Sequence, residues 1–195
     1  MLVTSCHKGE VVQEKNYSAN ELMLNTSNPG KFEEFKRLFA KHDRTLTATH
    51  EDLPEIDADP VTVVAHKASS VPENVIVEDT SLDVEGAEVG INIRWLLDHL
   101  QEYAGKKATW TVLLAMHRGD MVVVYKGEVH GTIVQSKGKG GFGFDPYFLP
   151  DGSDQTLAQF KPDSVNARAK AVEALVENRI YKQVPAIKEW HGKWQ

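Results

Sequence analysis

The feature that most constrains the fold is a pair of apolar segments joined by a tight turn. Residues 109–116 and 121–125 are rich in aliphatic, aromatic and β-branched side chains, and Arg118-Gly119-Asp120 lies between them. Two such segments separated by a short glycine-containing turn are typical of a β-hairpin. The second strand is predicted to continue through residues 126–134. The chain is therefore predicted to contain a pair of antiparallel strands.

The segments around this hairpin alternate between strand and helix patterns. Strands are predicted at residues 21–24, 45–49 and 75–77, and helices at about residues 32–39, 60–68, 93–103 and 164–178. Asp59-Pro60 is a typical helix start, because an aspartate cap is followed by proline at the first helical position. Helices mixed with both hairpin and crossover strands predict an α/β fold around one sheet.

The length of 195 residues fits one domain, predicted at residues 21–195, because domains usually have about 100–200 residues. Residues 1–20 are polar and weakly patterned, and we interpret them as an N-terminal extension. They lack the apolar stretch of a signal peptide, and no apolar run in the chain approaches the roughly 18–20 residues of a membrane span. The single cysteine, Cys6, excludes an internal disulfide framework and a cysteine zinc cluster. A soluble, cytoplasmic protein without a membrane partner is predicted.

The charge balance disfavours proteins that bind long nucleic acids. The chain has 22 Lys and Arg against 28 Asp and Glu, a net charge of −6. Proteins that bind nucleic acid through its phosphates are normally basic, so no nucleic-acid partner is predicted. A small phosphorylated ligand fits, because a few local cations are enough to bind it.

A polar loop between the first strand and the first helix is a candidate phosphate site. Thr26-Ser27-Asn28-Pro29-Gly30-Lys31 presents backbone N–H groups at the start of a helix, and Lys31 adds a positive charge. The loop matches neither the Walker nor the dinucleotide-binding pattern. The alternative interpretation is an ordinary capped turn.

Two adjacent carboxylates, Glu78 and Asp79, follow the Val-Ile-Val strand. Open α/β sheets bind ligands at the carboxyl ends of their strands. Carboxylates there can hold Mg²⁺ or take a proton from water. Glu55 is a candidate third carboxylate, although its spacing in the sequence does not predict proximity. The alternative is a solvated strand end.

The glycine-rich loop at residues 141–146, Gly-Phe-Gly-Phe-Asp-Pro, is a candidate nucleobase pocket. Its glycines permit close backbone approach, its phenylalanines offer a stacking surface, and Asp145 offers a hydrogen-bond acceptor. The alternative is a structural turn with the aromatic rings in the core. We expect one of the two phenylalanines to pack in this way in either case.

Taken together, these motifs resemble the inosine triphosphate pyrophosphatase family, from about Leu22 to Val176. The matching segments are Thr26–Lys31, Leu53-Pro54-Glu55, Val77-Glu78-Asp79-Thr80-Ser81-Leu82, Gly141–Pro146, Pro150-Asp151-Gly152 and Gln155-Thr156-Leu157-Ala158. Each motif alone is modest, but their order and spacing match the family.

The resemblance implies a long, curved, mixed β-sheet flanked by helices, in two lobes with the active site in a central cleft. It also implies a homodimer. Enzymes of this family use Mg²⁺ to cleave the α–β bond of ITP, dITP or XTP, releasing the nucleoside monophosphate and pyrophosphate. This reaction removes non-standard purine nucleotides from the nucleotide pool.

The resemblance also assigns roles to individual positions. The implied phosphate-binding residues are Thr26, Ser27, Asn28 and Lys31, with Ser27 where the family usually has glycine. The implied metal ligands are Glu55, Asp79 and Glu78, and Asp79 is also the implied activator of water. Thr80 and Arg94 fall at positions that contact substrate, and Lys67 and Lys31 are implied catalytic residues together with Asp79. The implied base-binding residues are Phe142, Gly143, Phe144 and Asp145.

The end of the family pattern differs in this chain. The family has lysine, a short spacer and serine–histidine–arginine, where this sequence has Lys161 and then Asn166-Ala167-Arg168. Lys161 and Arg168 therefore take the implied lysine and arginine positions, and Ala167 replaces the histidine that reads the base. Two alternatives to the family activity follow: a pyrophosphatase for another modified or pyrimidine nucleotide, and a nucleotide-binding module without turnover.

Overall fold

The computed structural model describes residues 21–88 and 93–195, and its centre is a seven-stranded mixed sheet. The strands are β1 (Glu21–Asn25), β2 (Thr45–Thr49), β3 (Val75–Val84), β4 (Lys107–Arg118), β5 (Met121–Ile133), β6 (Phe148–Pro150) and β7 (Lys182–Pro185). The helices are α1 (Pro29–Ala40), α2 (Pro60–Ser69), α3 (Ile93–His99) and α4 (Ala167–Val176), with short 3-10 helices η1 (Leu100–Tyr103), η2 (Asp145–Tyr147) and η3 (Asp163–Val165). The predicted α/β class is confirmed, and the predicted extension at residues 1–20 lies outside the described residues.

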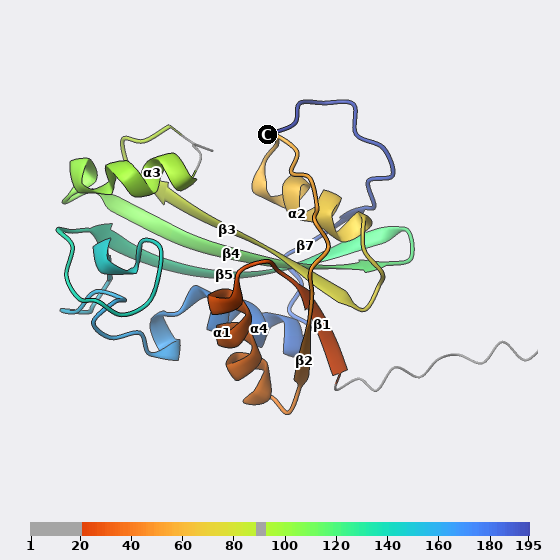
Figure 1. The fold of residues 1–195 in the computed structure, drawn as a ribbon, viewed down its shortest axis with the longest axis horizontal. Coiled ribbons are helices and arrows are strands. Elements are labelled where there is room, and N and C mark those ends of the chain that lie inside the picture. Colours follow the sequence, from red (N-terminus) through yellow and green to blue (C-terminus); the bar gives the residue numbers. More distant parts are fainter. Residues whose placement is uncertain (1–20, 89–92) are drawn as a thin grey trace, which may run out of the picture.

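The sheet contains both parallel and antiparallel strand pairs. The strand order is β2-β1-β3-β4-β5-β6, and β7 pairs with β5. β1 is parallel to β2 and to β3, with α1 and α2 in the crossover connections. β3, β4 and β5 are antiparallel to one another. Figure 1 shows these three as long twisted strands that join a part with α1, α2 and α4 to a part with α3 and the loop before β6. The long strands therefore connect two lobes.

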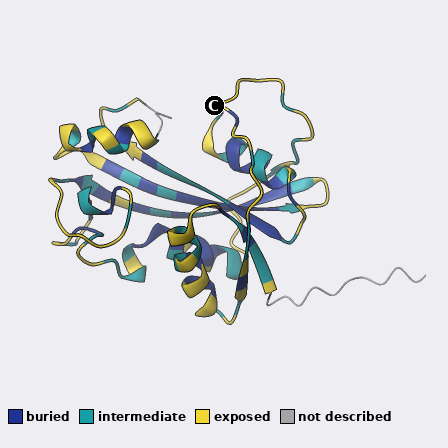
Figure 2. Ribbon diagram, viewed as in Figure 1, coloured by how far each residue is buried: buried dark blue, intermediate teal, exposed yellow. Residues whose placement is uncertain are grey.

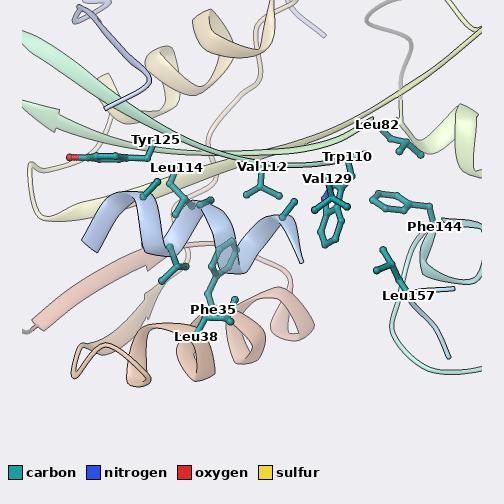
Figure 3. Packing of buried hydrophobic residues seen from close by; sticks show 14 of the residues in the cluster. Phe35, Leu38, Leu82, Trp110, Val112, Leu114, Tyr125, Val129, Phe144 and Leu157 are labelled. Atoms are coloured by element: carbon teal, nitrogen blue, oxygen red, sulfur yellow. The ribbon is translucent and has the colours of Figure 1, made fainter. Parts of the chain in front are cut away.

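Alternating side chains on β4 explain how both faces of the sheet are covered. Val112 and Leu114 belong to the larger hydrophobic cluster, together with residues of α1 and α4, whereas Leu113 and Ala115 belong to a second cluster with α2. Successive side chains of a strand point to opposite faces, so a strand covered on both sides is apolar throughout. Figure 3 shows Phe35 of α1 pointing toward α4 in the larger cluster, and Figure 2 shows exposed residues along the outer side of α1.

The helix starts follow from their capping residues. The Asp59 side chain accepts a hydrogen bond from the backbone N–H of Thr62, and Pro60 begins α2, as predicted. Asn166 accepts hydrogen bonds from the backbone N–H groups of Arg168 and Ala169, so α4 begins at Ala167 rather than at residue 164 as predicted. Among the described residues, no helix has the length and apolar character that crossing a membrane requires.

Gly127 allows α4 to lie directly against β5. A Cβ atom at this position would lie 2.0 Å from the carbonyl oxygen of Ala167 and 2.4 Å from the backbone nitrogen of Ala171. Both contacts are shorter than atoms tolerate, so only glycine fits between this strand and the helix backbone. The close approach fixes the N-terminal end of α4, and with it Arg168, relative to the sheet.

Candidate active site

The loop between β1 and α1 forms a capped helix start with a lysine in its first turn. The Asn28 side chain accepts a hydrogen bond from the backbone N–H of Lys31 at 3.1 Å. The Thr26 hydroxyl accepts one from the backbone N–H of Asn28 at 3.2 Å. Thr26 is buried, whereas Ser27 and Asn28 are exposed. The predicted capped turn is therefore present, and its exposed side includes the start of a helix, which favours anions.

Two lysines gather the three predicted carboxylates next to this loop. The Lys31 ammonium lies 2.8 Å from Glu78 Oε1. The Lys67 ammonium lies 2.7 Å from Glu55 Oε1 and 3.7 Å from Asp79 Oδ1. It also donates a hydrogen bond to the backbone carbonyl of Glu78 at 3.4 Å. Glu55 thus joins the group, a proximity that its spacing in the sequence did not predict.

Strand pairing explains why the loop and the carboxylates meet. β1 pairs in parallel with β3 as far as Leu24 and Ile76, so the loop after β1 lies beside the next residues of β3. Those residues include Glu78 and Asp79, which pair with β4 in the middle of β3. The expectation that the two carboxylates follow the end of a short strand is therefore wrong, because β3 continues to Val84 against β4 after leaving β1.

The neighbouring carboxyl groups of Glu78 and Asp79 have different pKa values, because their surroundings differ. Burial raises the pKa of Glu78, but the charge and hydrogen bond of Lys31 outweigh burial and hold that pKa below its ordinary value. Burial raises the pKa of Asp79 to about 6, since Lys67 offsets it only in part and the charges of Glu78 and Glu55 add to it. Burial lowers the pKa of Lys67, but the hydrogen bond that Lys67 donates to Glu55 and the charges of Asp79 and Glu55 bring that pKa above its ordinary value.

A second group lies at the start of α4 and the glycine-rich loop. The Asp145 carboxylate accepts hydrogen bonds from Lys161 Nζ at 2.9 Å and from the backbone N–H of Phe142 at 3.1 Å. Arg168 Cζ lies 4.8 Å and Lys161 Nζ 5.0 Å from the centre of the Phe142 ring. Arg168 also contacts Glu34 at 3.2 Å. Two cations thus lie against one partly exposed aromatic ring.

The two phenylalanines of the glycine-rich loop have different environments, as expected. Phe144 is 5% exposed and packs edge-on against Trp110, with ring centres 5.6 Å apart. Phe142 is only partly buried. A Cβ atom at Gly30 would lie 3.8 Å from the Phe142 ring, so the loop between β1 and α1 and the glycine-rich loop are adjacent.

The remaining predicted residues have different environments. Arg94 is exposed on α3, and Gly143 is exposed in a left-handed conformation, with φ of 61°. Ala167 is fully buried against β5 and belongs to the core. Thr80 joins the first group, because its hydroxyl donates to Glu78 Oε2 at 3.2 Å.

Glu34 is a site residue that the sequence pattern missed. A glutamate on a helix is usually solvated, but the Glu34 side chain is 11% exposed and contacts Arg168 and Lys161. It also accepts a hydrogen bond from the Asn166 side chain at 2.6 Å. Its spacing of three residues from Lys31 places both on one side of α1, and this was the available signal.

The carboxylates fit a divalent cation that is shared with a ligand. Among residues 21–88 and 93–195, no three His, Cys, Asp or Glu side chains converge closely enough to hold a metal ion by themselves. Glu78 is paired with Lys31, and the roles of Glu55, Glu78 and Asp79 as metal ligands stay predictions. Mg²⁺ commonly takes one or two carboxylates and completes its shell with waters and phosphate oxygens. Glu55 and Asp79, on either side of Lys67, suit that kind of site.

Comparisons with known proteins find relatives that match most of this chain. The chain is 32% identical to the dITP/XTP pyrophosphatase of Pyrobaculum aerophilum over 174 residues, which are 79% of this chain and 93% of that protein. It is 31% identical to the dITP/XTP pyrophosphatase of Thermococcus kodakarensis over 169 residues, covering 78% of this chain and 91% of that protein. A crystal structure of a nucleoside-triphosphatase, or dITP/XTP pyrophosphatase, from Mycobacterium abscessus matches 80% of this chain and 98% of its own, with TM-score 0.50 and 25% identity.

The family pattern itself covers residues 22–178, which include both groups of side chains described above. This range agrees with the predicted span of the resemblance, from about Leu22 to Val176. Together with the relatives above, the match confirms the resemblance. The chain belongs to the Ham1 family.

Proposed function

We propose that this protein is a nucleoside triphosphate pyrophosphatase that hydrolyses the α–β bond of ITP, dITP and XTP, in a Mg²⁺-dependent reaction. The products are the nucleoside monophosphate and pyrophosphate. The observation that carries the proposal is the group of Lys31, Lys67 and three carboxylates beside a capped helix start. The names of the two relatives and of the matching structure support the same substrate class.

The phosphates would bind at the start of α1. A triphosphate carries about four negative charges, which need local positive charge to be held in an acidic protein. Lys31 in the first turn of α1 and Lys67, which lies near the following carboxylates, would supply this positive charge. These groups would orient the α-phosphorus toward Asp79.

Asp79 is the best candidate for the base that activates water. A general base works best when its pKa lies near the operating pH, and burial raises the pKa of Asp79 to about 6. Glu78 is paired with Lys31 and stays ionised, so it suits a positioning role. Water attack on the α-phosphorus would transfer a proton to Asp79 and release pyrophosphate.

Glu55 and Asp79 would hold the divalent cation. Bound there, the cation would neutralise charge on the phosphates and on the leaving pyrophosphate. Three carboxylates face two lysines in this group, so the group alone carries a net negative charge that would repel a triphosphate. That balance favours a cation as part of the substrate complex.

The base would bind beside Phe142. Its ring offers a stacking face, and the planar Arg168 guanidinium, held by Glu34, can donate to the 6-oxo oxygen of hypoxanthine or xanthine. Adenine has an amino group at that position and would leave the donor unpaired. Arg168 is therefore proposed to carry the base discrimination that the missing histidine supplies elsewhere in the family.

A pyrophosphate-release screen tests the proposal. It compares ITP, dITP and XTP with ATP, GTP and the pyrimidine triphosphates, with Mg²⁺ and after its removal by a chelator. The proposal is supported if pyrophosphate release requires Mg²⁺ and is faster with ITP, dITP and XTP than with the other triphosphates. Preference for a pyrimidine or another modified nucleotide would favour the first alternative, and tight binding without release would favour the binding module.

We also propose a cytoplasmic homodimer, as the family resemblance implies. Nucleotide pools are cytoplasmic, so a pool-cleansing enzyme acts there. Size-exclusion chromatography with light scattering checks the assembly: a mass of twice 21.8 kDa supports it, and a mass of 21.8 kDa contradicts it.

A further inference from the structure

A segment beyond the family match is built against the carboxylate group. The family pattern ends at residue 178, whereas the chain continues through β7 and beyond. Figure 1 shows this dark blue segment as a loop beside α2, with its end beside the orange segment that precedes α2. The backbone N–H of Ile187 donates to the Ser69 hydroxyl at 2.9 Å, which ties the start of this loop to α2. We refer to residues 188–195 as the C-terminal strap.

The end of the strap pairs with the residues around Glu55. Trp194 forms an antiparallel bridge with Ile56. The backbone N–H of Asp57 donates to the Lys193 carbonyl at 2.9 Å, and the backbone N–H of Gln195 donates to the Glu55 carbonyl at 3.0 Å. The Gln195 side chain adds a donor to the Ile56 carbonyl at 3.1 Å. Glu55 is thus flanked by three hydrogen bonds to the strap.

The segment that carries Glu55 has little other backbone support. It lies between β2 and α2 and belongs to neither. Glu51 is held by the Asn25 side chain at one end, and Asp59 caps α2 at the other. Within the described part of the chain, the backbone hydrogen bonds of residues 52–58 all go to residues 193–195. The strap therefore supplies the backbone hydrogen bonds of this segment, in addition to the burial of Ile56.

Two tryptophans anchor the strap to α2 next to Lys67. Trp194 and Trp190 pack edge-on against His66, with ring centres 5.5 Å and 6.4 Å apart. Burial lowers the pKa of His66, which keeps its ring uncharged in this contact at neutral pH. His66 directly precedes Lys67, which binds the Glu55 carboxylate at 2.7 Å. The strap thus contacts the residue before Lys67 and the backbone of Glu55, the two members of this ion pair.

A glycine keeps the turn of the strap tight. A Cβ atom at Gly192 would lie 2.6 Å from the Trp190 ring, so a side chain there would displace the ring or the backbone. The Trp190 indole N–H donates to the Lys193 carbonyl at 2.9 Å, the same carbonyl that accepts from Asp57. The Lys193 carbonyl oxygen therefore accepts hydrogen bonds from both the Trp190 ring and the Asp57 backbone.

We propose that the C-terminal strap positions Glu55 for binding of the divalent cation and the triphosphate, with Trp194 and Gln195 as positioning residues. This inference rests on the proposed function, because it needs Glu55 to act on the substrate complex. Changes to groups that orient a metal ligand typically lower metal affinity by about 10–100-fold. The strap would thus act on cation and substrate affinity more than on kcat.

The first test uses the full chain and measures pyrophosphate release from ITP against Mg²⁺ concentration. Trp194→Ala is expected to raise the half-saturating Mg²⁺ concentration by at least about 10-fold, with a smaller change in kcat. Trp194→Phe, which keeps a ring against His66, is expected to restore most of the loss. His191→Ala is the matched control, because that side chain is 86% exposed and pairs only with the exposed Glu189. Gln195→Glu replaces Trp194→Ala if the latter does not fold.

The second test separates positioning of Glu55 from general damage. In a Glu55→Ala background, Trp194→Ala is expected to have no further effect on the Mg²⁺ dependence. Hydrogen exchange of the Asp57 amide, measured by NMR without metal or nucleotide, is expected to accelerate in Trp194→Ala and Gln195→Glu but not in His191→Ala. Unchanged exchange and Mg²⁺ dependence, or an equal effect in the Glu55→Ala background, would overturn the inference. An unmodified protein that releases no pyrophosphate would instead overturn the proposed function.

Discussion

The contacts of Glu78 and Asp79 differ although the two residues are adjacent in the chain. Glu78 lies 2.8 Å from Lys31, whereas Asp79 is 3.7 Å from its nearest lysine, Lys67, which is closer to Glu55. The weaker pairing leaves burial as the dominant influence on Asp79, and its pKa rises to about 6. One carboxylate thus holds a lysine in place while the other is able to accept a proton.

Asp79→Asn is expected to fold and to bind nucleotide, but to lose at least about 100-fold in turnover, the lower range for removing a general base. Asparagine has the same shape but does not take up a proton. Turnover of ITP at saturating Mg²⁺ is the measurement. Asp83→Asn is the control on the same strand, because Asp83 is exposed. A folded Asp79→Asn variant with the turnover of the control would contradict the role of Asp79.

Lys31→Ala is expected to raise KM for every triphosphate by about 10-fold or more, since a hydrogen bond to a charged group is worth about 1.5–3 kcal/mol. The effect should not depend on the base, because Lys31 lies at the helix start and contacts Glu78. Lys36→Ala, at an exposed position of α1, is the control. Thermal melting checks the fold, as the change leaves Glu78 without its lysine. A KM defect for ITP that is absent for ATP would show that Lys31 acts on the base.

Short sequence motifs predicted most of the residues in the candidate site, but not which residues they contact. Lys31, Asp79 and Asp145 stand in short runs whose residue types indicate their chemistry. Glu34 does not, because a glutamate on a helix is usually solvated, and its contact with Arg168 joins residues 134 positions apart. Such pairings depend on how α1 and α4 pack, which no local pattern contains.

At the scale of elements, Glu34 links α1 to the start of α4. It accepts from the Asn166 side chain and from Arg168, whose own side chain is 3% exposed. Glu34→Gln removes the charge opposite a buried guanidinium and is expected to lower the free energy of unfolding by about 1.5–3 kcal/mol. Glu33→Gln, at an exposed neighbouring position, is expected to change it by less than about 0.5 kcal/mol. Urea unfolding measures both, and equal stabilities would contradict the link.

The start of α2 provides a pH-dependent contribution to stability. Hydrogen bonds from the Thr62 side chain and backbone lower the pKa of Asp59 below 3.8, despite some burial. Because the pKa of Asp59 is lower in the folded state than in the unfolded state, the ionised carboxylate stabilises the fold. This contribution is complete above pH 3.8 and is lost as pH falls through the pKa of the folded state. Asp59→Ala is therefore expected to lower the free energy of unfolding by about 1 kcal/mol at pH 7.

Asp59→Asn is the matched variant for this test, because asparagine caps a helix without titrating. Its stability should equal that of the parent at pH 7 and exceed it increasingly below pH 3.8. Urea unfolding at several pH values measures the difference between the two proteins. A difference that does not change with pH would contradict the titration of Asp59.

Local patterns predicted the existence of elements better than their extent. The helix start at Asp59-Pro60 and the strand Thr45–Thr49 were predicted correctly, because caps and alternation are local. β3 extends seven residues beyond the predicted end, since pairing with β4 supports its polar half. β6 and β7 were not predicted from the sequence. These strands have three and four residues and pair with β5, and such short segments show no recognisable alternation.

At the scale of the whole molecule, the sheet brings distant residues into one site. Lys31 and Glu78 are 47 positions apart, and Lys161 and Asp145 are 16 apart. α1 contributes one residue to each group, because Lys31 contacts Glu78 and Glu34 contacts Arg168. The positive charge is therefore local, and an acidic protein with net charge −6 can still bind a triphosphate.

The central claim is that water attacks the α-phosphorus of ITP. The most direct measurement is ³¹P NMR of the products after turnover of ITP with Mg²⁺ in ¹⁸O-labelled water. The account predicts IMP and pyrophosphate as products, with the label on the IMP phosphate, and no product from Asp79→Asn over the same time. Label in the pyrophosphate, or release of IDP and inorganic phosphate, would contradict it.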